Sequence, residues 1–126
     1  MKNYTRLKLN IKDKIYDIIK ISIERAVTDG KLPAAEYPGL KVEYPREAKF
    51  GDYSTPVALE SARLLKRSPM EIGGILKNYI CENTEIIGEV DLVKPGFINI
   101  FTSLEYLKNN MLEVIHSREK YGRQHK

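Results

Sequence analysis

The sequence has few of the residues that build metal, redox or catalytic sites. Its 126 residues include one cysteine, Cys81, and two histidines. A single cysteine forms neither an internal disulfide nor a zinc site, so we expect a half-buried structural thiol and a cytoplasmic protein. His116 and His125 lie near the C-terminus with no cysteine or carboxylate grouped around them. We therefore expect neither a metal site nor a catalytic residue.

Long apolar segments and phosphate-binding loops are missing as well. No apolar run approaches the roughly 18 residues that a membrane span requires, and the N-terminus lacks the apolar core of a signal peptide. The chain has no Gly-Lys-Ser/Thr, Gly-x-Ser-x-Gly or His-Glu-x-x-His motif, and Gly73-Gly74 falls inside a helical pattern. These absences predict a protein that contacts no membrane, has no cofactor of its own and is not an enzyme.

The formal net charge of +4 is concentrated at the two ends of the chain. Residues 1–20 carry six Lys/Arg against two Asp, and residues 116–126 carry four Lys/Arg against one Glu. The region between them has a slight acidic excess. Such a chain would bind nucleic acid only through a local patch, and the alternative is that the basic ends are simply solvated.

The first half of the chain predicts helices separated by a strand. Apolar residues at helical spacing predict a helix over 11–29, capped by Asn10 and ended by Gly30. Alternation over 40–44 predicts a half-buried strand closed by Pro45. Thr55 followed by Pro56 is typical of a helix start, with Thr55 as the cap.

The second half predicts a helix, a hairpin and a last helix. Ser68-Pro69-Met70-Glu71 is a capping box that opens a helix ending near Asn83. Strands are expected at 86–94 and 97–101, joined by a tight turn at Pro95-Gly96. Ser103 should cap a last helix whose inner face carries five apolar residues, namely Leu104, Leu107, Met111, Leu112 and Ile115.

These elements predict an α+β fold. We expect an antiparallel β-sheet of three to four strands with about four helices packed mainly on one face, in two layers. The core should form from the apolar stripes of the helices together with Val90, Leu92, Ile98 and Ile100. Phe50 and Tyr53 are not needed for that core.

The segment from Ala48 to Thr55 places aromatic, basic and acidic residues just before a helix start. Aromatic rings stack on unpaired bases, Asp or Thr can read a base edge, and a helix start favours an anion. Alternatively, Phe50 and Tyr53 fill the core while Asp52 helps to cap the helix. The residues alone leave both interpretations open.

The segment Pro95-Gly96-Phe97-Ile98-Asn99 is a hairpin turn with a second possible role. Phe97, Asn99 and Phe101 lie on the opposite strand face from Ile98 and Ile100. If helices cover only one face of the sheet, the two aromatic rings and the amide form a surface suited to nucleotides. If both faces are covered, the three residues belong to the core.

Three motifs together resemble a known family. Lys49-Phe50-Gly51-Asp52-Tyr53-Ser54-Thr55, Ser68-Pro69-Met70-Glu71-Ile72 and Pro95-Gly96-Phe97-Ile98-Asn99-Ile100 resemble, in order and spacing, the N-terminal additional domain of arginyl-tRNA synthetase. The resemblance implies one domain over 1–122 and the start of a linker to a missing catalytic domain at 123–126. Neither the His-Ile-Gly-His-like nor the Lys-Met-Ser-Lys-Ser-like signature of class I synthetases is present.

The resemblance implies a noncatalytic domain that binds the D-loop at the elbow of arginine tRNA. ATP and arginine would bind in the parent enzyme's catalytic domain, which would be the second partner. The implied RNA-binding residues form two groups: Lys49, Phe50, Asp52, Tyr53 and Thr55, and then Phe97 and Asn99. Arg46, Arg63, Lys66 and Arg67 are candidate phosphate contacts.

One position departs from the family, and two alternatives to RNA binding stay open. Many members have asparagine where this chain has Pro56, which has no donor for a base edge. The first alternative is a protein-interaction domain whose first and last helices dock on the catalytic body. The second is a free-standing enzyme, which the missing acid–base and metal clusters disfavour.

Overall fold

The computed structural model describes residues 2–109 and contains helices and a small sheet. The three α-helices are α1 (Lys2–Thr28), α2 (Val57–Leu65) and α3 (Pro69–Ile80), and a 3₁₀ helix, η1, spans Ala48–Phe50. The strands are β1 (Tyr53–Thr55), β2 (Ile87–Val93) and β3 (Phe97–Thr102). Residues 104–109 are also helical.

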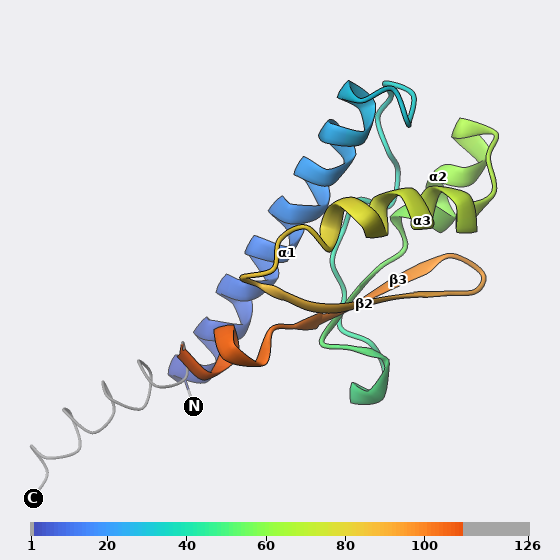
Figure 1. The fold of residues 1–126 in the computed structure, drawn as a ribbon. Helices are drawn as coiled ribbons and strands as arrows, with labels where there is room; N and C mark the ends of the chain where they lie inside the picture. Colours follow the sequence, from blue (N-terminus) through green and yellow to red (C-terminus); the bar gives the residue numbers. More distant parts are fainter. Residues whose placement is uncertain (1, 110–126) are drawn as a thin grey trace, which may run out of the picture.

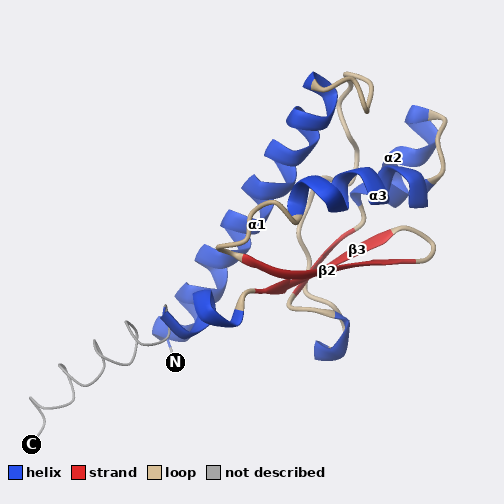
Figure 2. Ribbon diagram, in the orientation of Figure 1, coloured by secondary structure: helices blue, strands red, loops and turns tan. Residues whose placement is uncertain are grey.

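The sheet is antiparallel throughout, with β3 between β1 and β2. Figure 1 shows α2 and α3 over one face of this sheet and the segment containing η1 on the other. Figure 2 separates the layer of helices from the layer of strands. The predicted two-layer α+β fold is therefore confirmed. None of the helices in the described part of the chain is long and apolar enough to cross a membrane.

The core lies between the helices and the inner face of the sheet. The helices contribute buried isoleucines and leucine such as Ile15, Ile19, Ile72 and Leu76, and the sheet contributes chiefly Ile98 and Ile100. Period-2 alternation along β3 points those two isoleucines toward the helices. The same alternation turns Phe97 and Asn99 to the opposite face.

The helix ends follow local chemistry. At the C-terminus of α1, Gly30 has φ +76°, and the N–H groups of Gly30 and Lys31 donate to the carbonyls of Val27 and Ala26 at 3.0 and 2.9 Å. This is a Schellman arrangement, as expected for glycine after the last turn. At the start of α3, the Ser68 hydroxyl accepts the N–H groups of Met70 and Glu71. Both predicted boundaries are confirmed.

Two helices begin at residues other than those predicted. α1 runs through Asn10, because asparagine costs a helix interior well under 1 kcal/mol and no proline or glycine stops the preceding turns. α2 starts at Val57, one residue later than expected, with Pro56 in the cap position. The Thr55 hydroxyl nevertheless accepts the Val57 N–H at 3.3 Å, so it still satisfies one N–H at that helix start.

The strand predicted over 40–44 is reduced to a single bridge. Only Glu43 pairs with Ser54, through two backbone hydrogen bonds of 2.7 and 2.8 Å. β1 is only three residues long, and Pro45 removes the next donor, so the pairing cannot extend. Residues 53–55, for which the sequence analysis predicts no strand, form β1. The sheet of residues 2–109 therefore has three strands.

The helix at 104–109 is attached to α1. The Ser103 hydroxyl accepts the Tyr106 N–H at 3.2 Å, which confirms Ser103 as its cap. The Lys14 ammonium donates to the Tyr106 hydroxyl at 2.7 Å, and this hydrogen bond raises the pKa of Lys14. Leu107 packs against the core, but Leu104, the first residue of the helix and expected inside, is 83% exposed. Met111, Leu112 and Ile115 lie outside the described residues.

Candidate nucleic-acid interface

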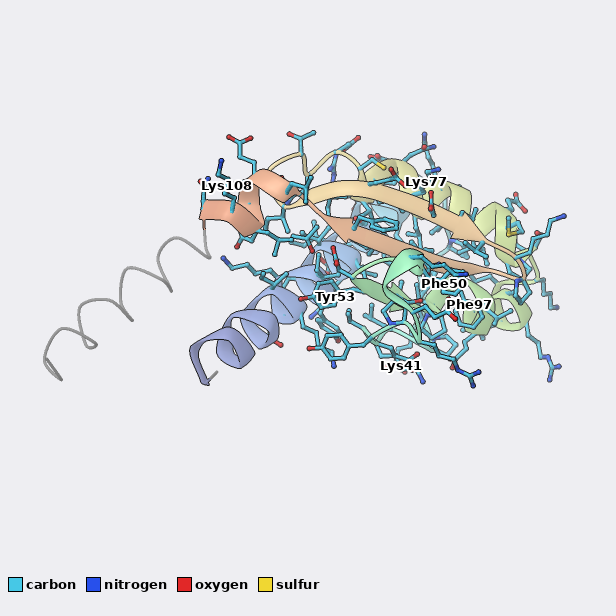
Figure 3. The ribbon with its side chains drawn as sticks, turned by 90° about the horizontal axis from the view of Figure 1, so that it is seen from below. Lys41, Phe50, Tyr53, Lys77, Phe97 and Lys108 are labelled. Carbon is cyan, nitrogen blue, oxygen red and sulfur yellow. The ribbon has the colours of Figure 1, made fainter. Side chains whose placement is uncertain are left out.

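A groove of about 380 Å³ lies on the sheet face opposite α2 and α3. Its walls come from three places: the segment from residue 43 to η1, the edge strand β1 and the hairpin β2–β3. The lining residues are Glu43, Tyr44, Pro45, Arg46, Phe50, Ser54, Val93, Phe97 and Asn99. Figure 3 shows Phe50 and Phe97 close together on this side of the molecule, with Lys77 on the other side.

Three aromatic side chains of the groove are open to solvent. Tyr44 is 45% exposed, Phe50 is 43% exposed and Phe97 is 36% exposed. Asn99 is only 6% exposed, because it lies on the central strand between Ser54 of β1 and Asp91 of β2. The groove therefore has exposed rings at its rim and a buried amide below them. Stacking platforms beside a hydrogen-bonding side chain are the usual components of a site for unpaired bases.

The loop that presents Phe50 is fastened to β3. The Asp52 N–H donates to the Ile100 carbonyl at 2.9 Å, and the Asp52 carboxylate accepts the Thr102 N–H at 2.8 Å. Gly51, at φ +126°, lies so close to β3 that a Cβ would be 3.0 Å from the Ile100 oxygen. The loop therefore holds Phe50 in place. Asp52 anchors this loop and does not cap α2, while its contact with RNA stays a prediction.

Lys49 lies beside Phe50 and is already paired. Its ammonium is 3.1 Å from the Glu47 carboxylate and 5.2 Å from the centre of the Phe50 ring. Both members of the ion pair are well exposed, so the pair is weak and can exchange for another anion. Lys49 therefore remains able to contact a phosphate.

Tyr53 and Thr55 do not face solvent. Tyr53 is 3% exposed and lies opposite Ile100 in the sheet register, so it shares the inner face with that isoleucine. Thr55 is fully buried, and its hydroxyl bonds the start of α2. The structure therefore does not bring these two predicted RNA contacts to the groove. The expectation that the core forms without Tyr53 is wrong, because Tyr53 belongs to the buried cluster. Pro56 is buried too, so its difference from asparagine leaves the groove unchanged.

The four candidate phosphate contacts lie in two different parts of the structure. Arg46 lines the groove. Arg63 belongs to α2, and Lys66 and Arg67 follow it in the turn toward α3. Arg67 donates to the Lys31 carbonyl at 2.8 Å, which places it at the far end of α1. Of the four, the structure brings only Arg46 to the exposed aromatics.

Comparison with known proteins identifies the family. The family model described as the arginyl tRNA synthetase N terminal domain matches residues 8–102. The chain belongs to this family. An arginine–tRNA ligase of Acetivibrio thermocellus is 34% identical over 119 residues, covering 94% of this chain and 21% of the ligase. The arginine–tRNA ligase of Bacillus subtilis is 30% identical over 115 residues, covering 90% of this chain and 21% of the ligase.

A solved structure shares the fold of this arginyl-tRNA synthetase N-terminal domain. The arginyl-tRNA synthetase of Plasmodium falciparum matches with a TM-score of 0.64 and 24% identity, over 79% of this chain and 17% of that one. The chain spans about a fifth of the length of the curated relatives it matches. Across residues 2–109, no three His, Cys, Asp or Glu side chains are grouped so as to hold a metal.

Sequence reasoning missed several residues of the groove in this domain. Tyr44 lies in the strand predicted over 40–44, and Ser54 lies in the segment before the helix start. Val93 is the last residue of β2, next to the hairpin turn. Val93 had a usable signal, because it lies directly opposite Phe97 in the predicted hairpin. The sequence carried no such signal for Tyr44, because only the bridge between Glu43 and Ser54 brings its segment to the sheet.

Proposed function

We propose that this domain binds the unpaired D-loop at the elbow of arginine tRNA through the groove. The observation that carries the proposal is the pair of exposed rings, Phe50 and Phe97, beside the buried Asn99 amide, in a chain of the arginyl-tRNA synthetase N-terminal family. One unstacked base would lie against the rings, and the Asn99 amide would bond its edge. Arg46 and Lys49 would contact backbone phosphates.

The size and shape of the groove support single-stranded RNA as its ligand. A volume of about 380 Å³ is at the low end of the range for small-ligand pockets, which suits one extruded base rather than a helix. The sheet face that carries the groove is free of α2 and α3, as in other domains that stack bases on a sheet. The sequence-independent part of the affinity would come from the cations at the rim.

In the full enzyme, the domain would supply affinity and orientation rather than chemistry. Residues 1–122 would form it, and 123–126 would begin the linker to a catalytic domain that binds ATP and arginine. That catalytic domain would activate arginine and transfer it to the tRNA. The domain itself would need no cofactor.

A titration against an arginine tRNA transcript tests the proposal with a matched pair of variants. Phe97→Ala removes a ring from the groove, whereas Leu64→Ala shortens an exposed apolar residue of α2 that does not line the groove. Loss of one base–aromatic stack costs about 1–3 kcal/mol, so Phe97→Ala should weaken binding about 5- to 150-fold. Leu64→Ala should bind like the unmutated chain. Equal effects of the two changes, or no binding by the unmutated chain, would contradict the proposal.

A second candidate function is docking on another part of the synthetase. A groove of about 670 Å³ beside the helix at 104–109 is lined by apolar residues that include Ile87, Phe101, Leu104 and Leu107. The exposed Leu104 favours this function, because a large apolar side chain at a groove mouth suits a protein contact. In a full-length synthetase, Leu104→Ser would then lower arginine activation and aminoacylation together. Phe97→Ala would lower aminoacylation alone.

A further inference from the structure

A lysine of α1 lies against an aromatic ring at the edge of the groove. The Lys12 ammonium is 4.8 Å from the centre of the Tyr44 ring, and Tyr44 also lines the groove. The two residues come from separate elements, a helix and the segment before η1. This contact connects α1, whose sequence carries much of the basic charge, to the exposed aromatic face of the sheet.

Tyr44 is held firmly enough to position that ammonium. Its neighbour Glu43 is joined to Ser54 by two backbone hydrogen bonds, and Pro45 follows it. The Tyr44 ring packs on the buried Tyr53 ring, with centroids 5.6 Å apart. A cation held over a fixed ring has already lost part of its rotamer freedom, so it loses less when an anion binds. The ring contacts both Lys12 and Tyr53, so it supports the ammonium from a fixed position.

Lys12 is available to an external anion. Among the side chains that the structure describes, which begin at residue 11, the ion pairs are Arg25–Glu82, Lys41–Glu60 and Lys49–Glu47, and none of them includes Lys12 or Arg46. Glu43 is the acidic side chain in the lining of the groove, and Arg46 offsets its charge there. Lys12 therefore leaves a net positive charge at the Tyr44 edge. That charge suits a strand of phosphates that continues past the groove.

We propose that Lys12, positioned by Tyr44, binds a backbone phosphate of the RNA strand whose base occupies the groove. The inference rests on the proposed function and extends the interface from the sheet onto α1. Phe50 and Phe97 stack the base, and Lys12 binds the strand as it leaves the groove past Tyr44. Tyr44 acts as a positioning residue, because it reaches the RNA through Lys12.

The test compares four variants of the full 126-residue chain in titrations against an arginine tRNA transcript at several salt concentrations. Lys12→Gln keeps most of the stem and removes the charge. Tyr44→Leu removes the ring support, and Tyr44→Phe preserves it. Lys77→Ala removes a lysine from the side opposite Phe50 and Phe97 and is the matched control (Figure 3). Thermal melts accompany each titration.

Lys12→Gln should weaken binding about two- to fivefold at low salt, with an unchanged melting temperature. The slope of log K against log salt should fall by about 0.7, the value for one phosphate of a single strand. Tyr44→Leu should show part of this loss of affinity, whereas Tyr44→Phe, which keeps the ring, should bind like the unmutated chain. Lys77→Ala should change neither the affinity nor the slope.

Two results would overturn the inference, and they differ in what else they overturn. If Lys12→Gln behaves like Lys77→Ala while Phe97→Ala still weakens binding, the phosphate contact is wrong and the proposed function stands. If the parent chain does not bind the transcript, or Phe97→Ala binds like the parent, the proposed function fails and the Lys12 contact fails with it.

Discussion

Replacing Tyr53 by alanine tests whether the loop before α2 is part of the core. Tyr53 is 3% exposed, packs with the buried cluster and shares the inner sheet face with Ile100. Truncating a buried aromatic residue to alanine costs about 3–5 kcal/mol, because the site loses its transfer free energy and leaves a cavity. Domains of this size have total stabilities of about 5–15 kcal/mol, so the variant should be severely destabilised.

Phe50→Ala provides the control, because it removes an aromatic ring three residues earlier from an exposed position. With 43% of Phe50 exposed, its loss should change the free energy of unfolding by less than about 1 kcal/mol. Urea unfolding followed by circular dichroism measures both variants. For a urea slope of about 1–3 kcal/mol/M, Tyr53→Ala should lower the midpoint by more than about 1 M.

The two variants should also differ in why they bind tRNA more weakly. Tyr53→Ala should bind less only to the extent that it is unfolded, so a stabilising osmolyte should restore its binding. Phe50→Ala should stay folded, and osmolyte should not restore its binding. A Tyr53→Ala chain with the parent's urea midpoint would refute the assignment of this ring to the core.

Three further outcomes are expected. Asp52→Ala should lower the free energy of unfolding by about 1–2 kcal/mol in urea titrations, because the Thr102 N–H loses its acceptor. Asp52→Asn keeps an oxygen there and should lower the free energy of unfolding less. An Asp52→Ala chain as stable as the unmutated chain would contradict the anchoring role. Lys49→Ala should lower tRNA affinity less than Phe97→Ala and should reduce the slope of log K against log salt by about 0.7, with an unchanged slope counting against a phosphate contact. The purified chain should show no arginine-dependent ATP–pyrophosphate exchange, and measurable exchange would show that a catalytic site was missed.

Much of the fold follows from local sequence signals. Gly30, Ser68 and Ser103 stop or start helices through hydrogen bonds that form within a few residues of each other. The hairpin β2–β3 follows from alternation on both sides of Pro95-Gly96, where Gly96 has φ +154°. These elements were predictable because propensity, capping and turn chemistry act over short distances.

The strand predicted over 40–44 shows where local sequence signals are no longer sufficient. The alternation of Leu40, Val42 and Tyr44 is real, but a strand needs a partner of matching length. The partner is β1, only three residues long, so one bridge forms. Pairing between segments about ten residues apart depends on the whole sheet, and the pattern of either segment alone does not contain it.

The candidate site divides in the same way. The sequence by itself determined the two candidate segments, 48–55 and 95–99, the outward alternation of Phe97 and Asn99, and the likeness to arginyl-tRNA synthetases. Only the tertiary structure decided that Phe50 faces solvent while Tyr53 fills the core, because Tyr53 lies in β1 opposite Ile100 whereas Phe50 lies in η1, outside the sheet. It also decided that Lys12 of α1 lies over Tyr44, since helix packing alone joins those distant segments.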